Sequence, residues 1–236
     1  MSKPKLIYAT DFYCVWCYAF SPVVQKIAKH FGDDLDIQII VGDMLSKPTP
    51  ITDLFSGAGD PMEVHSRITA VTGESFGNAY LSKIKIMKRE PWKIESAVPA
   101  KAMLAMRRIK PGWDFIIHER ILSAYYQLGK NISHIETYEF ITDGLSIDFK
   151  DFTAALDSPE IESDFRLGRE HLEGKSIHDF PTLAVEFEHG RTIPLSIGFN
   201  LFLKVSSGLR DLLRVSGRPA NVTSTSHCLD GPKSRA

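Results

Sequence analysis

The chain has 236 residues, of which 43% are hydrophobic and 24% are charged, and its formal net charge is −1. This length can hold one large domain or a domain with an insertion, and the composition is that of an ordinary globular protein. The balanced charge argues against nucleic acid as the main partner, which needs a concentrated basic surface, and no apolar run approaches the length of a membrane span.

Two of the three cysteines, Cys14 and Cys17, form a Cys-x-x-Cys motif near the N-terminus. Residues 1–5 lead directly into a β-prone segment without a signal-peptide pattern, so we expect a cytoplasmic protein. In a reducing compartment, few cysteines with two of them in this motif indicate redox chemistry and not a disulfide-stapled fold.

Residues 1–56 predict a β–α–β unit, the first part of a domain. Residues 5–11 are β-prone, residues 17–31 carry apolar side chains at helical spacing, and residues 36–42 form a mostly apolar second strand. Pro22 lies inside the predicted helix, where it removes a backbone hydrogen bond. Two parallel strands joined by such a helix have a right-handed crossover.

Residues 57–174 predict an insertion made of helices alone, after an irregular segment at residues 46–50. Asp60 and Asp148 each precede a helical pattern, and aspartate is a favoured N-cap residue. One helix is predicted to begin at Pro61, and the others cover residues 97–110, 113–128, 134–142, 149–156 and 159–173. Because no strand is expected between them, they predict a helical subdomain.

Strand patterns return in residues 175–214, the second part of the interrupted domain. Residues 182–187 and 192–197 flank a turn and predict a hairpin, in which Pro194 indicates an edge strand or a bulge. Asn200 precedes a last helix that carries apolar residues as far as Leu213. Residues 215–236 are small and polar, which predicts a mobile tail that contains Cys228 as a bystander thiol.

The Cys-x-x-Cys motif lies where the first strand ends and the first helix begins. Unpaired backbone N–H groups and the positive end of the helix dipole stabilise a thiolate at Cys14 in this position. Cys17 lies one turn further on the same helical face, so the two sulfurs can bond. We expect Cys14 to attack a substrate disulfide and the less exposed Cys17 to resolve the mixed disulfide.

Two other interpretations of the motif remain open. It can be half of a zinc site, but the only further cysteine is Cys228 and no histidine pair follows at zinc-finger spacing. It can also be a structural disulfide, although so short a loop restricts the unfolded chain little. We expect no metal.

The motif and the order of the elements resemble the DsbA-like thiol–disulfide oxidoreductases, and within them the cytosolic FrnE-like branch. Residues 179–183 resemble the cis-proline loop of that family, and Gly198–Phe199 resembles the turn before its last helix. The resemblance implies an α/β thioredoxin-like fold with a large all-helical insertion between the βαβ unit and a C-terminal ββα unit. The motif residues that match are Asp11, Cys14, Trp16, Cys17, Tyr18, Phe20 and Pro22.

The resemblance also implies roles for the residues around the cysteines. Pro181 would be cis and pack near Cys14, and Phe180 would offer its backbone to an extended substrate. Trp16, Phe180 and Pro181 are thus expected to bind substrate, with Cys14 and Cys17 catalytic. Asp11 is either a buried proton acceptor for Cys17 or the residue that ends the strand.

One departure from the family pattern affects the expected reduction potential of the cysteine pair. Many DsbA-like oxidants have a histidine between the cysteines, whereas this chain has Val15-Trp16. The thiolate then receives less stabilisation, and we expect a reduction potential of about −180 to −230 mV, below that of the strong oxidants.

The leading functional hypothesis is a thiol–disulfide oxidoreductase or isomerase acting on protein or small-molecule disulfides. It needs no cofactor, with glutathione or a reductase as redox partner and no nucleic-acid or membrane partner. The alternative is a glutathione-dependent enzyme similar to kappa-class glutathione transferases and hydroxychromene-carboxylate isomerases, which have a serine where Cys14 stands. A third is a non-catalytic module that binds clients through the helical subdomain.

Overall fold

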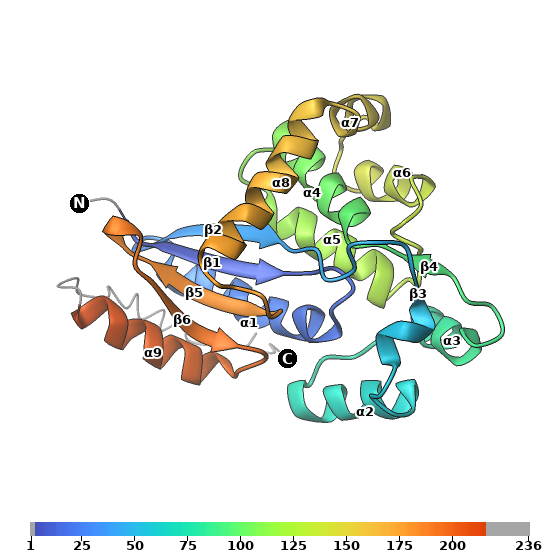
Figure 1. Cartoon of the computed structure of the whole chain (residues 1–236), viewed down its shortest axis with the longest axis horizontal. Coiled ribbons are helices and arrows are strands. Elements are labelled where there is room, and N and C mark those ends of the chain that lie inside the picture. The colour runs from blue at the N-terminus through green and yellow to red at the C-terminus, as the bar shows by residue number, and fades with distance from the viewer. Residues whose placement is uncertain (1–2, 216–236) are drawn as a thin grey trace, which may run out of the picture.

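The computed structural model describes residues 3–215, so Cys228 and the predicted tail beyond residue 215 lie outside the described residues. Its centre is a four-stranded sheet with the strand order β2–β1–β5–β6 (Figure 1). β1 runs parallel to β2 and antiparallel to β5, and β6 pairs antiparallel with β5 at one edge. The strands are Lys5–Thr10 (β1), Asp36–Val41 (β2), Thr182–Glu186 (β5) and Thr192–Ile197 (β6).

Helices cover both faces of this sheet, with α1 and α9 on one face and α8 across the other (Figure 1). Successive side chains of β1 point to opposite faces, so Leu6 and Tyr8 enter the main core, while Ile7 and Ala9 pack in a smaller cluster with Leu172 of α8. The predicted α/β architecture is confirmed. The helix bounds are Val15–Phe31 (α1), Pro159–Gly174 (α8) and Phe202–Val215 (α9).

The insertion between β2 and β5 is mostly helical, as predicted. Asp60 and Asp148 cap α2 and α7, because each carboxylate accepts hydrogen bonds from backbone N–H groups two and three residues on. The sequence does not predict α3, which follows Gly77 and has no side-chain cap. No helix among residues 3–215 has the length and apolarity needed to cross a membrane. The bounds are Pro61–Thr72 (α2), Asn78–Ile86 (α3), Ala97–Ile109 (α4), Asp114–Tyr126 (α5), Glu136–Asp143 (α6) and Phe149–Leu156 (α7).

The expectation that residues 46–50 are irregular and that the insertion contains no strand is wrong. Thr49–Pro50 (β3) pairs antiparallel with Lys93–Ile94 (β4), and a 3-10 helix at Ile51–Phe55 follows β3. Each of these strands has two residues, too few for an alternating pattern to show in the sequence. The pairing joins two distant parts of the chain, which local propensity does not predict.

The predicted C-terminal hairpin is confirmed, with a 3-10 turn at Glu188–Gly190. Pro194 lies on β6, an edge strand, where its missing N–H interrupts no second ladder. The register passes from the Ala184–Pro194 pair to the Leu183–Ser196 pair, so a bulge lies beside this proline.

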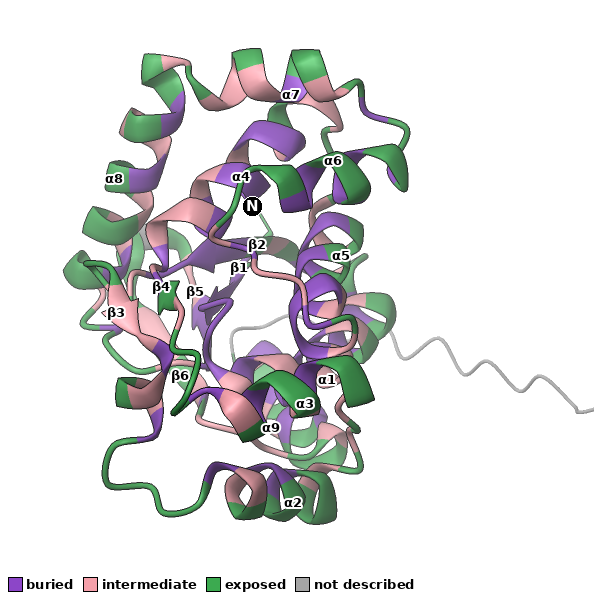
Figure 2. Ribbon diagram, turned by 90° about the vertical axis from the view of Figure 1, so that its right-hand side faces the viewer, coloured by how far each residue is buried: buried purple, intermediate pink, exposed green. Residues whose placement is uncertain are grey.

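One continuous buried cluster joins the sheet to the insertion. Figure 2 shows α5 largely buried, whereas α2 is largely exposed. Tyr125 of α5 meets Tyr13 edge-on with ring centroids 5.1 Å apart, and Tyr126 stacks on Tyr18 at 4.5 Å. The insertion therefore packs, through these tyrosine rings, against the start of α1, where the two cysteines lie.

Candidate active site

Cys14 is the N-cap residue of α1. Its extended backbone, with φ −79° and ψ 108°, lets the side chain fold over the open end of the helix. The Cys14 sulfur accepts a hydrogen bond from the backbone N–H of Cys17 at 3.3 Å. The cysteine sulfur thus takes the place of a serine or aspartate oxygen at a helix N-terminus, where negative charge is stabilised.

Cys17 lies in the first turn of α1 and is fully buried, while Cys14 is 7% exposed. Both are free thiols. Burial raises the pKa of the Cys17 thiol well above its ordinary value, and Cys14 raises it further. The backbone N–H of Asp11 and the hydroxyl of Thr10 act in the opposite direction, because each donates a hydrogen bond to the Cys17 sulfur. Only Cys14 is reachable from outside, which fits the predicted division between attacking and resolving cysteine.

The loop before β5 meets this helix end. The Phe180–Pro181 peptide bond is cis, as predicted. The Cys14 thiol donates to the Phe180 carbonyl oxygen at 3.5 Å, although the two residues are 166 positions apart in the sequence. The Pro181 carbonyl accepts from the backbone N–H of Gly198 at 2.8 Å, which ties the loop to the end of β6. The structure thus brings Cys14, Cys17 and the Phe180–Pro181 segment together.

Trp16 lies at the rim, where 37% of the residue is exposed. Its ring centroid is 6.3 Å from that of Phe199, which follows the glycine that bonds to Pro181. The two rings form an apolar edge beside the cis-proline loop. The sequence predicted Trp16 as a substrate-binding residue but assigned Phe199 only to a turn.

The Asp11 side chain is fully buried and faces the segment after β2. Its carboxylate accepts from the backbone N–H of Tyr13 at 2.9 Å and from that of Met44 at 3.0 Å. Burial raises the pKa of this carboxyl from 3.8 to about 6, and these hydrogen bonds limit the increase. The carboxylate thus bonds to the backbone just after β1 and just after β2, and a role as proton acceptor for Cys17 stays a prediction.

Asp11 should make folding stability depend on pH. A carboxyl whose pKa is raised in the folded chain binds its proton more tightly there, so its contribution is full below pH 3.8 and is lost as pH rises through about 6. The shift corresponds to about 3 kcal/mol. Urea unfolding at pH 4 to 7 should show this loss in the wild type and not in Asp11→Asn. A stability difference between the two proteins that does not change over this range would contradict the assignment.

Three residues that lie behind Cys17 were not identified as site residues from the sequence. Tyr8, Thr10 and His118 are each fully buried. The Tyr8 hydroxyl donates to the Cys17 carbonyl oxygen at 3.1 Å, and the Thr10 hydroxyl lies 3.3 Å from Nε2 of His118. No sequence signal singles out His118, because it lies on an ordinary amphipathic helix far from the motif.

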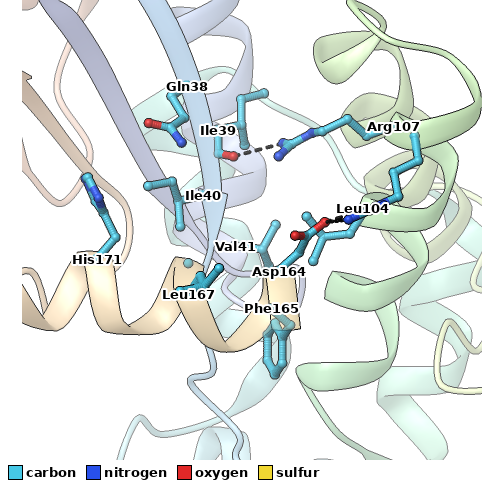
Figure 3. Close-up of a pocket in the computed structure, with 12 residues that line it drawn as sticks. Gln38, Ile39, Ile40, Val41, Leu104, Arg107, Asp164, Phe165, Leu167 and His171 are labelled. Atoms are coloured by element: carbon cyan, nitrogen blue, oxygen red, sulfur yellow. Dashed lines mark hydrogen bonds and ion pairs between the residues drawn. The ribbon is translucent and has the colours of Figure 1, made fainter. Parts of the chain in front are cut away.

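A cavity of about 320 Å³ lies elsewhere, between β2, α4 and α8 (Figure 3). Its charged groups are already paired: Arg107 donates to the Ile39 carbonyl oxygen at 2.9 Å, and Arg108 binds Asp164 through two nitrogens. None of the residues predicted for the redox site lines it. The cavity is therefore separate from the cysteine pair.

The architecture and the cysteine pair at the start of α1 define the class: this is a DsbA-like thioredoxin fold, in which a helical insertion separates the βαβ and ββα units. No protein-family model and no curated protein matches the sequence.

Several solved structures are similar to this chain. A candidate protein disulfide isomerase from Nitrosomonas europaea is 20% identical, with a TM-score of 0.78 over 91% of this chain and 99% of that one. The cytosolic disulfide reductase DsbM from Pseudomonas aeruginosa is 25% identical, with a TM-score of 0.71 over 89% and 99%. DsbM has also been solved with GSH. The oxidoreductase DsbA from Xylella fastidiosa is 16% identical, with a TM-score of 0.56 over 90% and 87%.

Proposed function

We propose that this chain is a thiol–disulfide oxidoreductase that acts on protein disulfides through Cys14 and Cys17. One observation carries the proposal: a cysteine at the N-cap of α1 lies against the cis-proline loop, with a second, buried cysteine one turn behind it. A structural disulfide does not need one cysteine that can be reached from outside and a cis-proline loop beside it. A redox pair needs both features.

The reaction has two exchange steps. The Cys14 thiolate attacks one sulfur of the client disulfide, forms a Cys14–client disulfide and releases the other client sulfur as a thiolate. Cys17 then loses its proton to solvent and attacks the Cys14 sulfur, which forms the Cys14–Cys17 disulfide and releases the second client thiolate. The client gains two electrons and the enzyme loses two, and the reverse sequence oxidises a dithiol client.

The client is expected to dock along the Phe180–Pro181 segment. The Phe180 carbonyl oxygen lies 3.5 Å from the Cys14 sulfur, so an extended chain that pairs with this backbone places its own sulfur near Cys14. The apolar edge formed by Trp16 and Phe199 offers contact to side chains of the client. We therefore propose Trp16, Phe180 and Pro181 as substrate-binding residues.

Glutathione is the redox partner we propose for the reducing direction. DsbM, a cytosolic disulfide reductase of similar fold, has been solved with GSH. By the same chemistry, two glutathione molecules would reduce the Cys14–Cys17 disulfide here, in a reducing compartment such as the cytoplasm, and no bound cofactor is needed.

A paired assay tests the proposed function against the glutathione-transferase alternative. We expect the protein to accelerate the reduction of insulin disulfides by glutathione, measured by precipitation of the insulin B chain. We expect no conjugation of glutathione to 1-chloro-2,4-dinitrobenzene above the uncatalysed rate. Conjugation without insulin reduction would favour the transferase, in which one nucleophile suffices and Cys17 has no role.

A further inference from the structure

A buried polar network lies directly behind the resolving cysteine. The Thr10 side chain lowers the pKa of the buried Cys17 thiol by hydrogen bonding. Its hydroxyl lies 3.3 Å from Nε2 of His118 and 3.3 Å from the Tyr8 hydroxyl. On its other side, His118 Nδ1 is 3.4 Å from the Ser21 hydroxyl oxygen. The strand, the active-site helix and the insertion therefore meet in one chain of polar contacts, which runs from Ser21 through His118, Thr10 and Tyr8 to the Cys17 carbonyl oxygen.

His118 is enclosed on all sides. Its ring centroid lies 5.6 Å from that of Tyr8 and 5.2 Å from that of Phe12, and the residue has no exposed surface. Burial and, to a smaller extent, the positive charge of Arg107 on α4 lower the pKa of His118 to about 3. The imidazole is therefore neutral at physiological pH and has one N–H donor and one acceptor nitrogen.

The neighbours determine which nitrogen holds the proton. If Ser21 donates to Nδ1, the proton sits on Nε2 and is donated to the Thr10 oxygen. Thr10 then keeps its own hydrogen free, and that hydrogen can point to the Cys17 sulfur or to the Tyr8 oxygen 3.3 Å away. The opposite tautomer would take the Thr10 hydrogen away from the sulfur.

We propose that His118, supplied by the helical insertion, is a positioning residue that holds the Thr10 hydroxyl as a hydrogen-bond donor to the Cys17 thiolate. This inference rests on the proposed function and assigns the control of its second step, the attack of Cys17 on the mixed disulfide. The thiolate forms in a buried site with Cys14, Tyr8 and Tyr126 as its ionisable neighbours. Neither Tyr8 nor Tyr126 is cationic, and the nearby Arg107 is paired with Asp114. Neutral donors therefore have to supply the stabilisation. These are the Asp11 backbone N–H and the Thr10 hydroxyl, and it is Thr10 that contacts His118.

The test separates the two exchange steps with 5,5′-dithiobis(2-nitrobenzoate). Attack by Cys14 releases one nitrothiobenzoate and leaves the other as a mixed disulfide, and attack by Cys17 releases the second. Stopped-flow absorbance records both releases. Thr10→Val removes the hydroxyl at nearly constant shape, and His118→Phe removes its partner. We expect the first phase to stay within about threefold of wild type.

The second phase should slow in both variants, and its pH midpoint should rise by about one unit. Each unit lowers the thiolate fraction tenfold but raises the nucleophilicity of the remaining thiolate, so the net slowing is about threefold per unit below the midpoint. Thr10→Ser restores the hydroxyl and should restore the rate and the midpoint. Thr142→Val and His65→Phe are matched controls, because they alter a buried threonine and a buried histidine of the insertion and should leave the second phase unchanged.

Three results would overturn the inference: an unchanged second phase in Thr10→Val, no rescue by Thr10→Ser, or equal slowing of both phases. A fourth result, in which the wild type releases only one nitrothiobenzoate, would overturn the proposed function together with it. The number of molecules released by the wild type thus distinguishes failure of the inference from failure of the redox assignment.

Discussion

Cys17→Ser is expected to accumulate disulfide-linked complexes with its clients, and Cys14→Ser is not. In the first variant Cys14 still attacks from the N-cap of α1, but no second thiolate follows to release the client. In the second variant serine has no accessible anion at neutral pH, so exchange should fall by about 10³-fold or more. Non-reducing electrophoresis after acid quenching, with and without dithiothreitol, measures the trapped fraction.

The burial of the two cysteines underlies this asymmetry. Cys17 has no exposed surface, so a client disulfide cannot reach its sulfur while α1 is intact. The double variant Cys14→Ser/Cys17→Ser is the control for non-covalent binding and should give no dithiothreitol-sensitive band. Equal trapping by the two single variants would mean that either sulfur can attack and that the assigned roles are incorrect.

Gly42→Ala is expected to impair catalysis on proteins without touching either cysteine. A Cβ atom at Gly42 would lie 2.0 Å from Cζ of the Phe180 ring, far inside contact distance. The ring is half-buried against the small cluster under α8, so it must shift to make room for the added methyl group. Because a displacement of about 1 Å can lower a rate by 10²-fold, we expect insulin reduction to fall by about 10- to 100-fold.

The same variant should leave the small-molecule reaction largely intact. 5,5′-Dithiobis(2-nitrobenzoate) needs only the Cys14 thiolate, so its first phase should change by less than about threefold. Phe180→Ala removes the clashing ring but keeps the backbone carbonyl, and the double variant Gly42→Ala/Phe180→Ala should therefore recover most of the insulin activity. If the double variant is as poor as Gly42→Ala alone, the effect does not pass through Phe180.

The sequence predicts those parts of the structure that have a local pattern. α1, β1, β2 and the hairpin each carry a period or a cap in consecutive residues, and Asp60 and Asp148 mark helix starts by residue type. The cysteine pair is itself a motif of four residues, whereas the cis bond before Pro181 was expected from the resemblance of residues 179–183 to the family's cis-proline loop. For the helices, strands and caps, neighbouring residues contain the physical cause.

Features that depend on distant partners were not predictable in this way. β3 and β4 are two-residue strands that are stabilised by pairing with each other. The need for glycine at position 42 arises because the Phe180 ring packs against it, and Phe180 is distant in the sequence. His118 reaches Thr10 across 108 positions, so nothing near either residue marks the contact. The burial of the Asp11 carboxylate likewise depends on the fold, which is why the sequence left its role open.

The distance along the chain between the two halves of the site has a consequence for biosynthesis. β5, which supplies the centre of the sheet beside β1, and the proline loop ahead of it leave the ribosome long after the cysteine pair. A nascent chain therefore displays reactive thiols before it has any surface that selects a partner for them. Productive encounters begin only after residues 180–186 have emerged, and until then the nascent polypeptide depends on its surroundings to keep those sulfurs from cross-linking at random.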